Sequence, residues 1–441
     1  MIACLFSTSA QAQEKRNLSL EEAIQMSLSH SNELKISQEK VNQAAAAARE
    51  AKERRLPDVK ISGSYLRLMQ PDVDLKIKMG SGQQQSTGEN PTPSSSAAFP
   101  TVNQAAYGSA NLTLPLFSGF KIQYGVDAAK YLWKATQLDA QKDKESVIQN
   151  TIAAYVNVYK SKAALELVTE NLHQSEQRVK DFSNLEKNGI VARNDLLKVQ
   201  LNESNISLAL MDAQHNYELS MIHLNLMLGL PEQTQLVIDS LDMIAPLTAS
   251  ESYDYWQNVA IENRADAQAL QYRIKAAQTG VKASKGEYYP SLALTGGYIA
   301  AYIPDVITLT NGLNAGIGLS YSPSSLWKTG AKVAQAKAQL AQAELSAGVL
   351  NDGIKLQVAQ AHQAYLSARQ KLSVYDKATE QANENYRIMK NKYQNALATA
   401  TELLEADVAQ LQANINRANG KADALVAYKR LLQATGTIEK Q

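Results

Sequence analysis

The sequence from Asn351 to Thr401 reads NDGIKLQVAQAHQAYLSARQKLSVYDKATEQANENYRIMKNKYQNALATAT. Apolar and small side chains recur in it at alternating spacings of four and three residues: Ile354, Val358, Ala361, Tyr365, Ala368, Leu372, Tyr375, Thr379, Ala382, Tyr386, Met389 and Tyr393. A stripe with this spacing is the a/d pattern of a coiled coil, sustained for longer than an ordinary globular helix requires. We therefore predict one long helix that ends near Asn395.

A second seam with the same spacing begins directly after this helix. It comprises Leu404, Val408, Leu411, Ile415, Ala418, Ala422 and Leu425. The residues between the two seams, 395–401, are too few for more than a tight turn. The two helices are therefore predicted to fold back on each other as a hairpin with its tip at 395–401.

An earlier part of the chain has the same organisation. Its two seams are Leu165, Val168, Leu172, Ser175, Val179 and Phe182, and then Leu197, Leu201, Ser204, Leu208 and Met211, with a tip at 188–195. Each hairpin is preceded by a helix that is predicted to end at a proline, Pro57 or Pro290, and by two strand-like segments. The recurring order predicts an internal twofold repeat.

Helix stops and polar runs predict the boundaries of these parts. The first repeat covers 13–231, a linker covers 232–250, the second repeat covers 251–436, and 437–441 is a tail. Ser19 and Glu22 have the spacing of a capping box, so a helix should begin there and run to about Arg55. A helix beginning at Tyr253 should open the second repeat and end at Tyr289.

Four segments show the alternation of transmembrane β-strands, at about 58–69, 107–117, 291–303 and 313–322. The polar run 71–104 is longer than a compact soluble domain usually tolerates, and we interpret it as an extracellular loop. A sheet in lipid leaves no open edge, because unpaired backbone groups cannot be hydrated there. Since single-chain barrels begin at about eight strands, this chain must share a barrel with copies of itself.

Composition narrows the possible functions. The formal net charge of +1 provides no overall field for nucleic acid, and no run of 18 apolar residues could form a transmembrane helix. A single cysteine, Cys4, excludes a disulfide within the chain. The histidines lack metal-ligand spacing, and neither a Ser-His-Asp order nor a phosphate-binding glycine loop occurs. We therefore expect no enzyme activity, no cofactor and no metal.

Residues 1–12 are interpreted as the remnant of a secretory signal peptide. An apolar start is followed by Thr8-Ser9-Ala10-Gln11-Ala12, which suits cleavage after Ala12. The basic residues that usually begin such a signal are missing, so we expect the natural start to lie upstream of Met1. Lipidation of Cys4 is the alternative interpretation.

These features resemble the outer-membrane efflux protein family, the TolC-like outer-membrane factors. The matching stretches are Leu18-Ser19-Leu20-Glu21-Glu22-Ala23, Leu114-Pro115-Leu116-Phe117-Ser118-Gly119, Leu224-Asn225-Leu226-Met227-Leu228-Gly229-Leu230-Pro231 and the two tips. The resemblance implies a mainly helical homotrimer of a Gram-negative cell. Its twelve-stranded β-barrel, four strands per chain, lies in outer-membrane lipid and continues into a helical tube in the periplasm.

The resemblance also implies the function and the partners. Proteins of this family are the exit ducts of tripartite efflux or type I secretion systems, exporting drugs, metals or proteins. Their partners are a periplasmic adaptor, or membrane fusion protein, and an inner-membrane pump of the RND, ABC or MFS type. A periplasmic coiled-coil adaptor and a soluble scaffold remain the alternatives, although an adaptor would need a single hairpin and a scaffold no strands.

Candidate site residues lie at the two tips. Glu402 and Glu405 match acidic residues that ring the family's periplasmic entrance, while Tyr393 and Asp195 match residues that hold it shut. The family's arginine near Ala398 is absent, and Arg193 is its candidate replacement. Two other roles stay open, a solvated face for the two glutamates and seam packing for Tyr393. The residues expected to dock the adaptor are Gly189, Ile190, Val191, Ala192, Ala396, Leu397, Ala398 and Thr399.

Overall fold

A computed structural model describes residues 16–67, 69, 103–238, 252–304, 307–395 and 397–440. The predicted signal peptide with Cys4, nearly all of the polar loop 71–104, and Ala396 lie outside these residues. The chain divides into two compact units. The first is drawn from 1–44, 131–274 and 342–441, and the second from 45–130 and 275–341.

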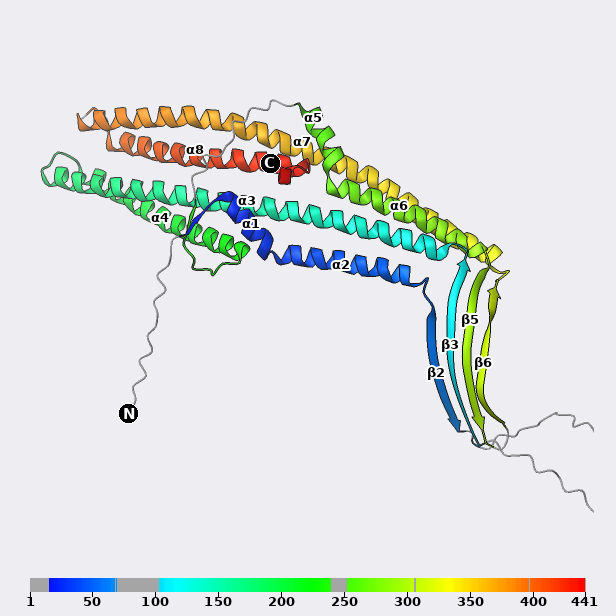
Figure 1. Ribbon diagram of the computed structural model, residues 1–441. Coiled ribbons are helices and arrows are strands. Elements are labelled where there is room, and N and C mark those ends of the chain that lie inside the picture. The colour runs from blue at the N-terminus through cyan, green and yellow to red at the C-terminus, as the bar shows by residue number, and fades with distance from the viewer. Residues whose placement is uncertain are drawn as a thin grey trace, which may run out of the picture. The chain divides into compact units, whose positions relative to one another are not determined.

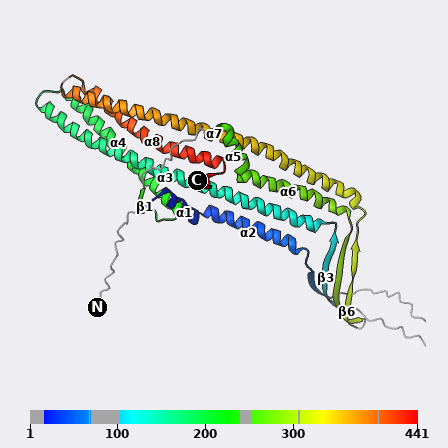
Figure 2. The same cartoon turned by 45° about the horizontal axis from the view of Figure 1, so that its top comes forward.

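Two helical hairpins run through the first unit. Helix α3 (Lys121–Lys187) is followed by α4 (Arg193–Leu228), and α7 (Ser325–Gln394) by α8 (Ala400–Ala434). In Figures 1 and 2, α4 lies along α3 and α8 lies along α7. Residues 121–130 of α3 and 325–341 of α7 belong to the second unit. No described helix is long and apolar enough to cross a membrane.

The seam predicted for α7 is confirmed, because every one of its positions is buried or half-buried. The seam predicted for α8 is wrong at Val408, whose side chain is 54% exposed. The first two turns of α8 instead bury Ala400, Leu403, Ala406 and Asp407. An aspartate is therefore buried one position before Val408, the residue at which the heptad pattern had predicted an apolar contact.

The seam predicted for α3 is confirmed, since its positions are buried or half-buried, but the seam predicted for α4 is wrong. Leu197, Leu201 and Leu208 are exposed in the chain. The buried face of α4 carries Leu196, Val199, Ile206, Ala213, Met221 and Leu224. Helix α4 has apolar residues on two sides, and only one side packs within its own chain.

Each helix predicted before a strand is interrupted. The first consists of α1 (Leu20–His30) and α2 (Asn32–Glu53), and the second of α5 (Tyr253–Asn263), α6 (Ala265–Lys285) and the 3-10 turn η1 (Gly286–Tyr288). Ser31 and Arg264 leave the helical region with ψ of 116° and 122°. The Ser31 hydroxyl accepts a hydrogen bond from the Leu34 N–H, which starts the new helix.

The ends of the two predicted repeats contain structure that the sequence interpretation missed. Strand β1 (Arg16–Leu18) pairs in parallel with β4 (Leu236–Ile238), which lies in the predicted linker. The Tyr155 hydroxyl donates to the Leu18 carbonyl at 2.9 Å. The predicted tail contains a 3-10 turn, η2 (Ile438–Lys440). The Ser19 cap is confirmed, but the Glu22 carboxylate pairs with Arg16 and does not complete a capping box.

The second unit holds a four-stranded antiparallel sheet in the order β2-β3-β5-β6 (Figure 1). The strands are β2 (Asp58–Arg67), β3 (Gln104–Ser118), β5 (Ser291–Ile303) and β6 (Ile307–Ser320). Strands β3 and β6 therefore begin earlier than predicted. Of the residues assigned to the polar loop, Gln104 lies in β3.

The register gives this sheet two different faces. Ile61, Ala110, Tyr298 and Leu313 form one row across all four strands. The neighbouring row on the opposite face contains Lys60, Asn111, Gly297 and Asn314. Because successive side chains of a strand point to opposite faces, one face of the sheet is mainly apolar and the other is small and polar.

Candidate functional site

The first tip is a tight turn between α3 and α4. Gly189 has a φ of +68°, which favours glycine. Its N–H donates to the Glu186 carbonyl and the Ile190 N–H donates to the Leu185 carbonyl, each at 2.9 Å. These two bonds form a Schellman motif, which satisfies carbonyls at the end of α3. A side chain at position 189 would therefore strain the backbone, although no atom lies within 4 Å of its Cβ position.

The second tip is closed by a capping box at the start of α8. The Glu402 N–H donates to the Thr399 hydroxyl at 3.2 Å, and the Thr399 N–H donates to the Glu402 carboxylate at 2.7 Å. The Thr399 hydroxyl also donates to that carboxylate. The motif Thr399-Ala400-Thr401-Glu402 has the spacing of a capping box, so the sequence did contain this signal and our interpretation missed it.

An apolar cluster joins the two tips within the first unit. Phe182, Leu196, Val199 and Ala400 form its buried part, and Tyr393 packs against it. The rings of Phe182 and Tyr393 stack with their centroids 5.1 Å apart. A groove of about 910 Å³ lies beside the cluster. We call it the tip groove; Arg178, Phe182, Asp195, Tyr386 and Tyr393 are among the residues that line it.

Glu402 and Glu405 both lie exposed on the first turns of α8. The hydrogen bonds from the backbone and hydroxyl of Thr399 hold the pKa of Glu402 below its ordinary value, and the charge of Lys392 adds to this. Glu402 is therefore ionised at neutral pH. Its carboxylate caps a helix, and the next carboxylate, Glu405, lies one turn along the same helix.

The residues predicted to close the entrance lie close to one another but do not form one network. Burial raises the pKa of the Tyr393 hydroxyl, and the charge of Asp195 raises it further. Asp195 is 3.6 Å from Lys198 in its own helix. The Arg193 guanidinium is 3.7 Å from Glu186 of the same hairpin, so it does not reach the second tip in this chain.

The residues predicted to dock a partner differ in exposure. Ile190 is 68% and Leu397 76% exposed, which makes them the prominent apolar side chains of the two tips. Val191 and Ala398 are half-buried, and Ala192 is the exposed cap residue of α4. Ala396 lies outside the described residues. Two large apolar side chains facing solvent suit protein contact better than the small residues beside them.

Two charged residues near the tips pair with each other in the structure, and the sequence interpretation did not identify them. The Arg178 guanidinium donates to the Asp407 carboxylate at 2.9 Å, and both side chains are buried. The two residues are 229 positions apart. No spacing rule connects residues so distant, and the only sequence signal was a charged residue on each helix.

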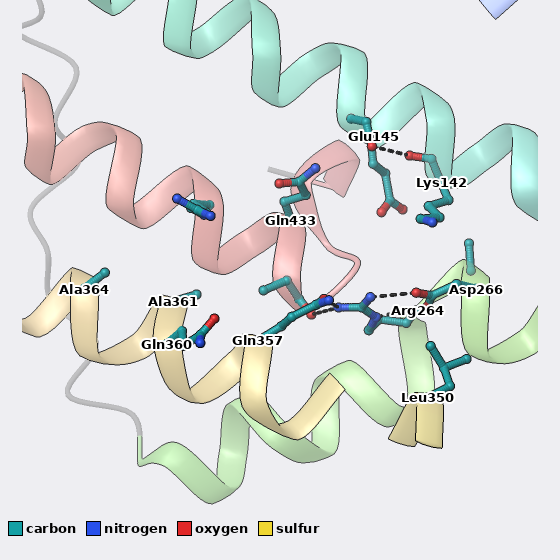
Figure 3. Close-up of a pocket in the computed structure, with 14 residues that line it drawn as sticks. Lys142, Glu145, Arg264, Asp266, Leu350, Gln357, Gln360, Ala361, Ala364 and Gln433 are labelled. Carbon is teal, nitrogen blue, oxygen red and sulfur yellow. Dashed lines mark hydrogen bonds and ion pairs between the residues drawn. The ribbon is translucent and has the colours of Figure 1, made fainter. Parts of the chain in front are cut away.

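A second polar cavity, of about 780 Å³, lies in the first unit (Figure 3). The Arg264 guanidinium there donates to Asp266, to the Gln357 side chain and to the Ala434 carbonyl. Although burial raises the pKa of Asp266, the hydrogen bonds and charge of Arg264 hold it below its ordinary value.

Glu145 reaches this cavity from α3 and is only 6% exposed. Burial, and then the charge of Glu439, raise the pKa of Glu145 to about 7, against the opposing charges of Arg264 and Lys144. Lys142 and Arg430 also line the cavity. Among the described residues, no group of three or more His, Cys, Asp or Glu side chains could hold a metal ion, here or elsewhere.

The model of the outer membrane efflux protein family matches residues 23–230 and 256–437. The chain belongs to the outer membrane efflux protein family. The match includes both hairpins, all four strands of the sheet and both tips. Proteins of this family act in transport at the outer membrane, and this efflux protein is accordingly a protein of the outer membrane.

Individual relatives are distant in sequence and close in fold. This efflux protein is 24% identical over 334 residues to the outer membrane efflux protein BepC of Brucella suis biovar 1 (strain 1330), covering 73% of this chain and 70% of BepC. The VceC outer membrane protein of Vibrio cholerae is 18% identical with a TM-score of 0.74, covering 95% of this chain and 96% of VceC. The CmeC outer membrane channel of Campylobacter jejuni is 17% identical with a TM-score of 0.77, covering 95% of this chain and 86% of CmeC.

Proposed function

We propose that three copies of this efflux protein form the outer-membrane exit duct of a tripartite efflux or type I secretion system. The duct receives substrates from an inner-membrane pump and a periplasmic adaptor and releases them outside the cell. The proposal rests mainly on the four-stranded sheet, which has one apolar face and two edge strands, β2 and β6.

The edges of the sheet require partners from other copies. An apolar face suits lipid, and lipid cannot satisfy the backbone groups of an open edge. In four antiparallel strands the first and last run in opposite directions, so β6 of one copy and β2 of the next would also pair antiparallel. Such a head-to-tail contact closes into a ring. Three copies supply twelve strands, an even number as in bacterial barrels.

Exposed apolar residues in the first unit support contacts between subunits. The outer side of α4 carries Leu197, Leu201, Leu208, Met211, Leu219 and Leu226, and α7 carries Leu345, Val349, Leu356 and Val374. We call these the α4 stripe and the α7 stripe. Rows of exposed apolar side chains such as these mark protein–protein interfaces. We assign both stripes to contacts between neighbouring subunits of the trimer.

The order of elements supports the internal repeat that we propose for 13–231 and 251–436. In each half, two short helices lead into two strands of the same sheet and then into a hairpin. The match of the family model to both halves disfavours an adaptor with one hairpin. We assign no catalytic step to the chain.

The two tips are proposed as the periplasmic entrance and as the docking site for the adaptor. Glu402 and Glu405 of three subunits would form a ring of six carboxylates, which attracts cations. Asp195 and Tyr393 would close the entrance beside the tip groove. Ile190 and Leu397 would supply the apolar contacts to the adaptor.

Light scattering of the full chain in detergent tests this proposal. Three copies of the 48.2 kDa chain predict a protein mass of about 145 kDa. The double variant Leu201→Asp, Leu208→Asp places two charges on the α4 stripe and should shift the mass towards a monomer. Gln214→Asp places a charge on another exposed side of α4 and should leave the trimer intact. A wild-type chain that is a monodisperse monomer overturns the proposal.

A further inference from the structure

The apolar face of the sheet ends in a pair of aromatic rings. Strand β3 shifts its register between Pro115 and Phe117. Phe117 therefore lies opposite Leu292, which is on the apolar face. The ring of Phe120, two residues after the end of β3, packs edge-on against the ring of Phe117 with the centroids 5.2 Å apart. Phe120 thus extends the apolar face beyond the last residue of the strand.

The backbone of Phe120 is strained, and its side chain faces solvent. Its φ is +63°, and Asn311 is the only other non-glycine residue with a positive φ in the described ranges. This conformation is unfavourable for a bulky side chain and would suit glycine. The ring is nevertheless 55% exposed, so burial within the chain does not offset the strain. An apolar partner outside the chain that covers the ring would offset it.

Close contact between two glycines joins this ring to the start of β5. A Cβ on Gly119 would overlap the Gly286 carbonyl, and a Cβ on Gly286 would overlap the Gly119 carbonyl. Tyr289 lies beside this contact, with its Cβ 3.2 Å from the Cβ position of Gly119. Lys121 also lies beside it, with its Cγ 2.7 Å from the Cβ position of Gly286. The exposed side chains at the end of β3 and at the start of β5 therefore form one surface.

The start of α7 adjoins the same surface. Lys332 donates to the Glu287 carboxylate at 2.7 Å. This ion pair fixes the first turns of α7 beside η1 and neutralises the acidic residue of η1. We call the exposed side chains around these contacts the junction patch, and its members are Phe120, Lys121, Lys285, Tyr289, Trp327 and Lys328.

The positive charge of the junction patch is not explained by contacts within the chain. None of Lys121, Lys285 and Lys328 has an ion-pair partner among the residues that the structure describes. Lys121 and Lys328 lie in the first turns of α3 and α7, where the helix dipole disfavours a cation. These two helices have no acidic residue in the first turn, whereas all six other described α-helices have one. The three lysines therefore suit an anionic partner outside the chain.

We propose that the junction patch binds the headgroups of anionic phospholipids in the membrane leaflet next to the periplasm. Aromatic side chains prefer the headgroup level of a membrane, and clustered lysines attract anionic headgroups. A soluble phosphate would satisfy the lysines but would leave the three aromatic rings in water. The inference rests on the proposed barrel, because that barrel sets the sheet in lipid with its helical end towards the periplasm.

Trp327 supplies a direct probe of the lipid at the junction patch. It is 69% exposed, whereas Trp256 is buried and Trp133 is half-buried. The full-length protein is reconstituted into vesicles of equal parts phosphatidylglycerol and phosphatidylcholine, with bromine on the acyl chains of one lipid or the other. Bromine quenches the fluorescence of a tryptophan that it contacts. We expect brominated phosphatidylglycerol to quench about three times as strongly as brominated phosphatidylcholine, or more, and Trp327→Phe to lose this difference.

Lysine variants test the origin of the preference. Lys121→Gln, Lys285→Gln and Lys328→Gln together should reduce the ratio of the two quenching constants to about one. The melting temperature in detergent should stay at the wild-type value. The same three positions changed to arginine keep the charge and should keep the wild-type ratio.

A matched control removes the same charge elsewhere. Lys40→Gln, Lys180→Gln and Lys421→Gln change three exposed lysines of the first unit. This variant should keep the wild-type ratio, because its substitutions lie outside the junction patch.

The outcomes separate this inference from the proposed function. A wild-type protein whose Trp327 is quenched by neither lipid would contradict the proposed barrel and the inference together. Equal quenching by both lipids, or a preference that persists in Trp327→Phe, would overturn the headgroup preference alone. Equal losses in the junction and control variants, or a loss in the arginine variant, would also overturn it. If the triple glutamine variant fails to fold, Lys328→Gln alone should lower the ratio, and an unchanged ratio there overturns the inference.

Discussion

Gly420 of α8 lies directly against the ring of Tyr375 of α7. A Cβ on Gly420 would come within 2.6 Å of Cδ2 and 3.0 Å of Cε2 of that ring. The absence of a side chain at 420 thus allows a seam tyrosine to pack on the neighbouring helix. Gly353, in α7, has no atom within 4 Å of its Cβ position.

Gly420→Ala should destabilise the protein although alanine favours a helix by about 1 kcal/mol. The ring of Tyr375 must move, and overpacking typically costs about 1–3 kcal/mol. Gly353→Ala is the matched control and should stabilise by about 0.5–1 kcal/mol. Thermal unfolding followed by circular dichroism measures both. Equal shifts of the melting temperature in the two variants would contradict the packing of Tyr375 on Gly420.

Glu145 predicts a pH dependence of stability. Its pKa of about 7 in the folded chain lies above the ordinary value of 4.5, so the folded state binds more protons between those pH values. The stability that this group provides is complete below about pH 4.5 and is lost as the pH rises through 7.

Glu145→Gln should therefore gain stability relative to wild type as the pH rises from 5 to 8, by about 2 kcal/mol. This change in the free energy of unfolding is smaller than the full pKa shift of Glu145 implies. The reason is that Glu145 borders the polar cavity, where solvent screens the charges around it. Glu176→Gln, at an exposed position of the same helix, is the control and should follow the wild-type profile. Denaturant unfolding measures the free energy of unfolding at each pH. If this free energy changes in parallel with pH in wild type and Glu145→Gln, the pKa of the Glu145 carboxyl is not raised in the folded protein.

Glu402 has two separable roles, capping α8 and contributing charge to the proposed entrance. Glu402→Gln keeps a side chain that accepts at the cap but removes the charge. Combined with Glu405→Gln, it should lower cation selectivity in bilayer recordings with little change in melting temperature. Thr399→Ala keeps both charges and loses the cap, so it should cost about 1 kcal/mol and leave selectivity intact. Unchanged selectivity in the glutamine double variant would place both carboxylates on a solvated outer face.

Ile190 and Leu397 should be essential for export but not for assembly. Ile190→Asp with Leu397→Asp places charges on the two exposed apolar side chains of the tips, and a buried unpaired charge strongly disfavours an interface. We expect loss of export in cells together with a normal trimer by light scattering. Gln214→Asp, at an exposed position of α4 outside the α4 stripe and away from the tips, should export normally. If the Ile190→Asp, Leu397→Asp variant exports as well as the wild type, the tips are not the docking site.

Periodicity made the long helices and the sheet predictable. The spacing from Ile354 to Tyr393 depends only on the geometry of one helix, which is why every seam position of α7 is at least half-buried. The alternation from Leu292 to Tyr298 likewise depends on one strand, and the register places Leu294 beside Leu114 and Ile317. The order of the elements and the resemblance together predicted the family.

Contacts between distant segments were decided only by the tertiary structure. Helix α4 has two apolar sides, and its sequence does not say which one packs in its own chain. Leu196 is buried and Leu197 is not because α3 and α8 approach from one direction. Asp407 could be placed in the core only because Arg178, far away in the sequence, arrives at the same point to neutralise it. A local pattern specifies which residues share a face, whereas burial and charge pairing depend on the neighbour that the whole fold brings to that face.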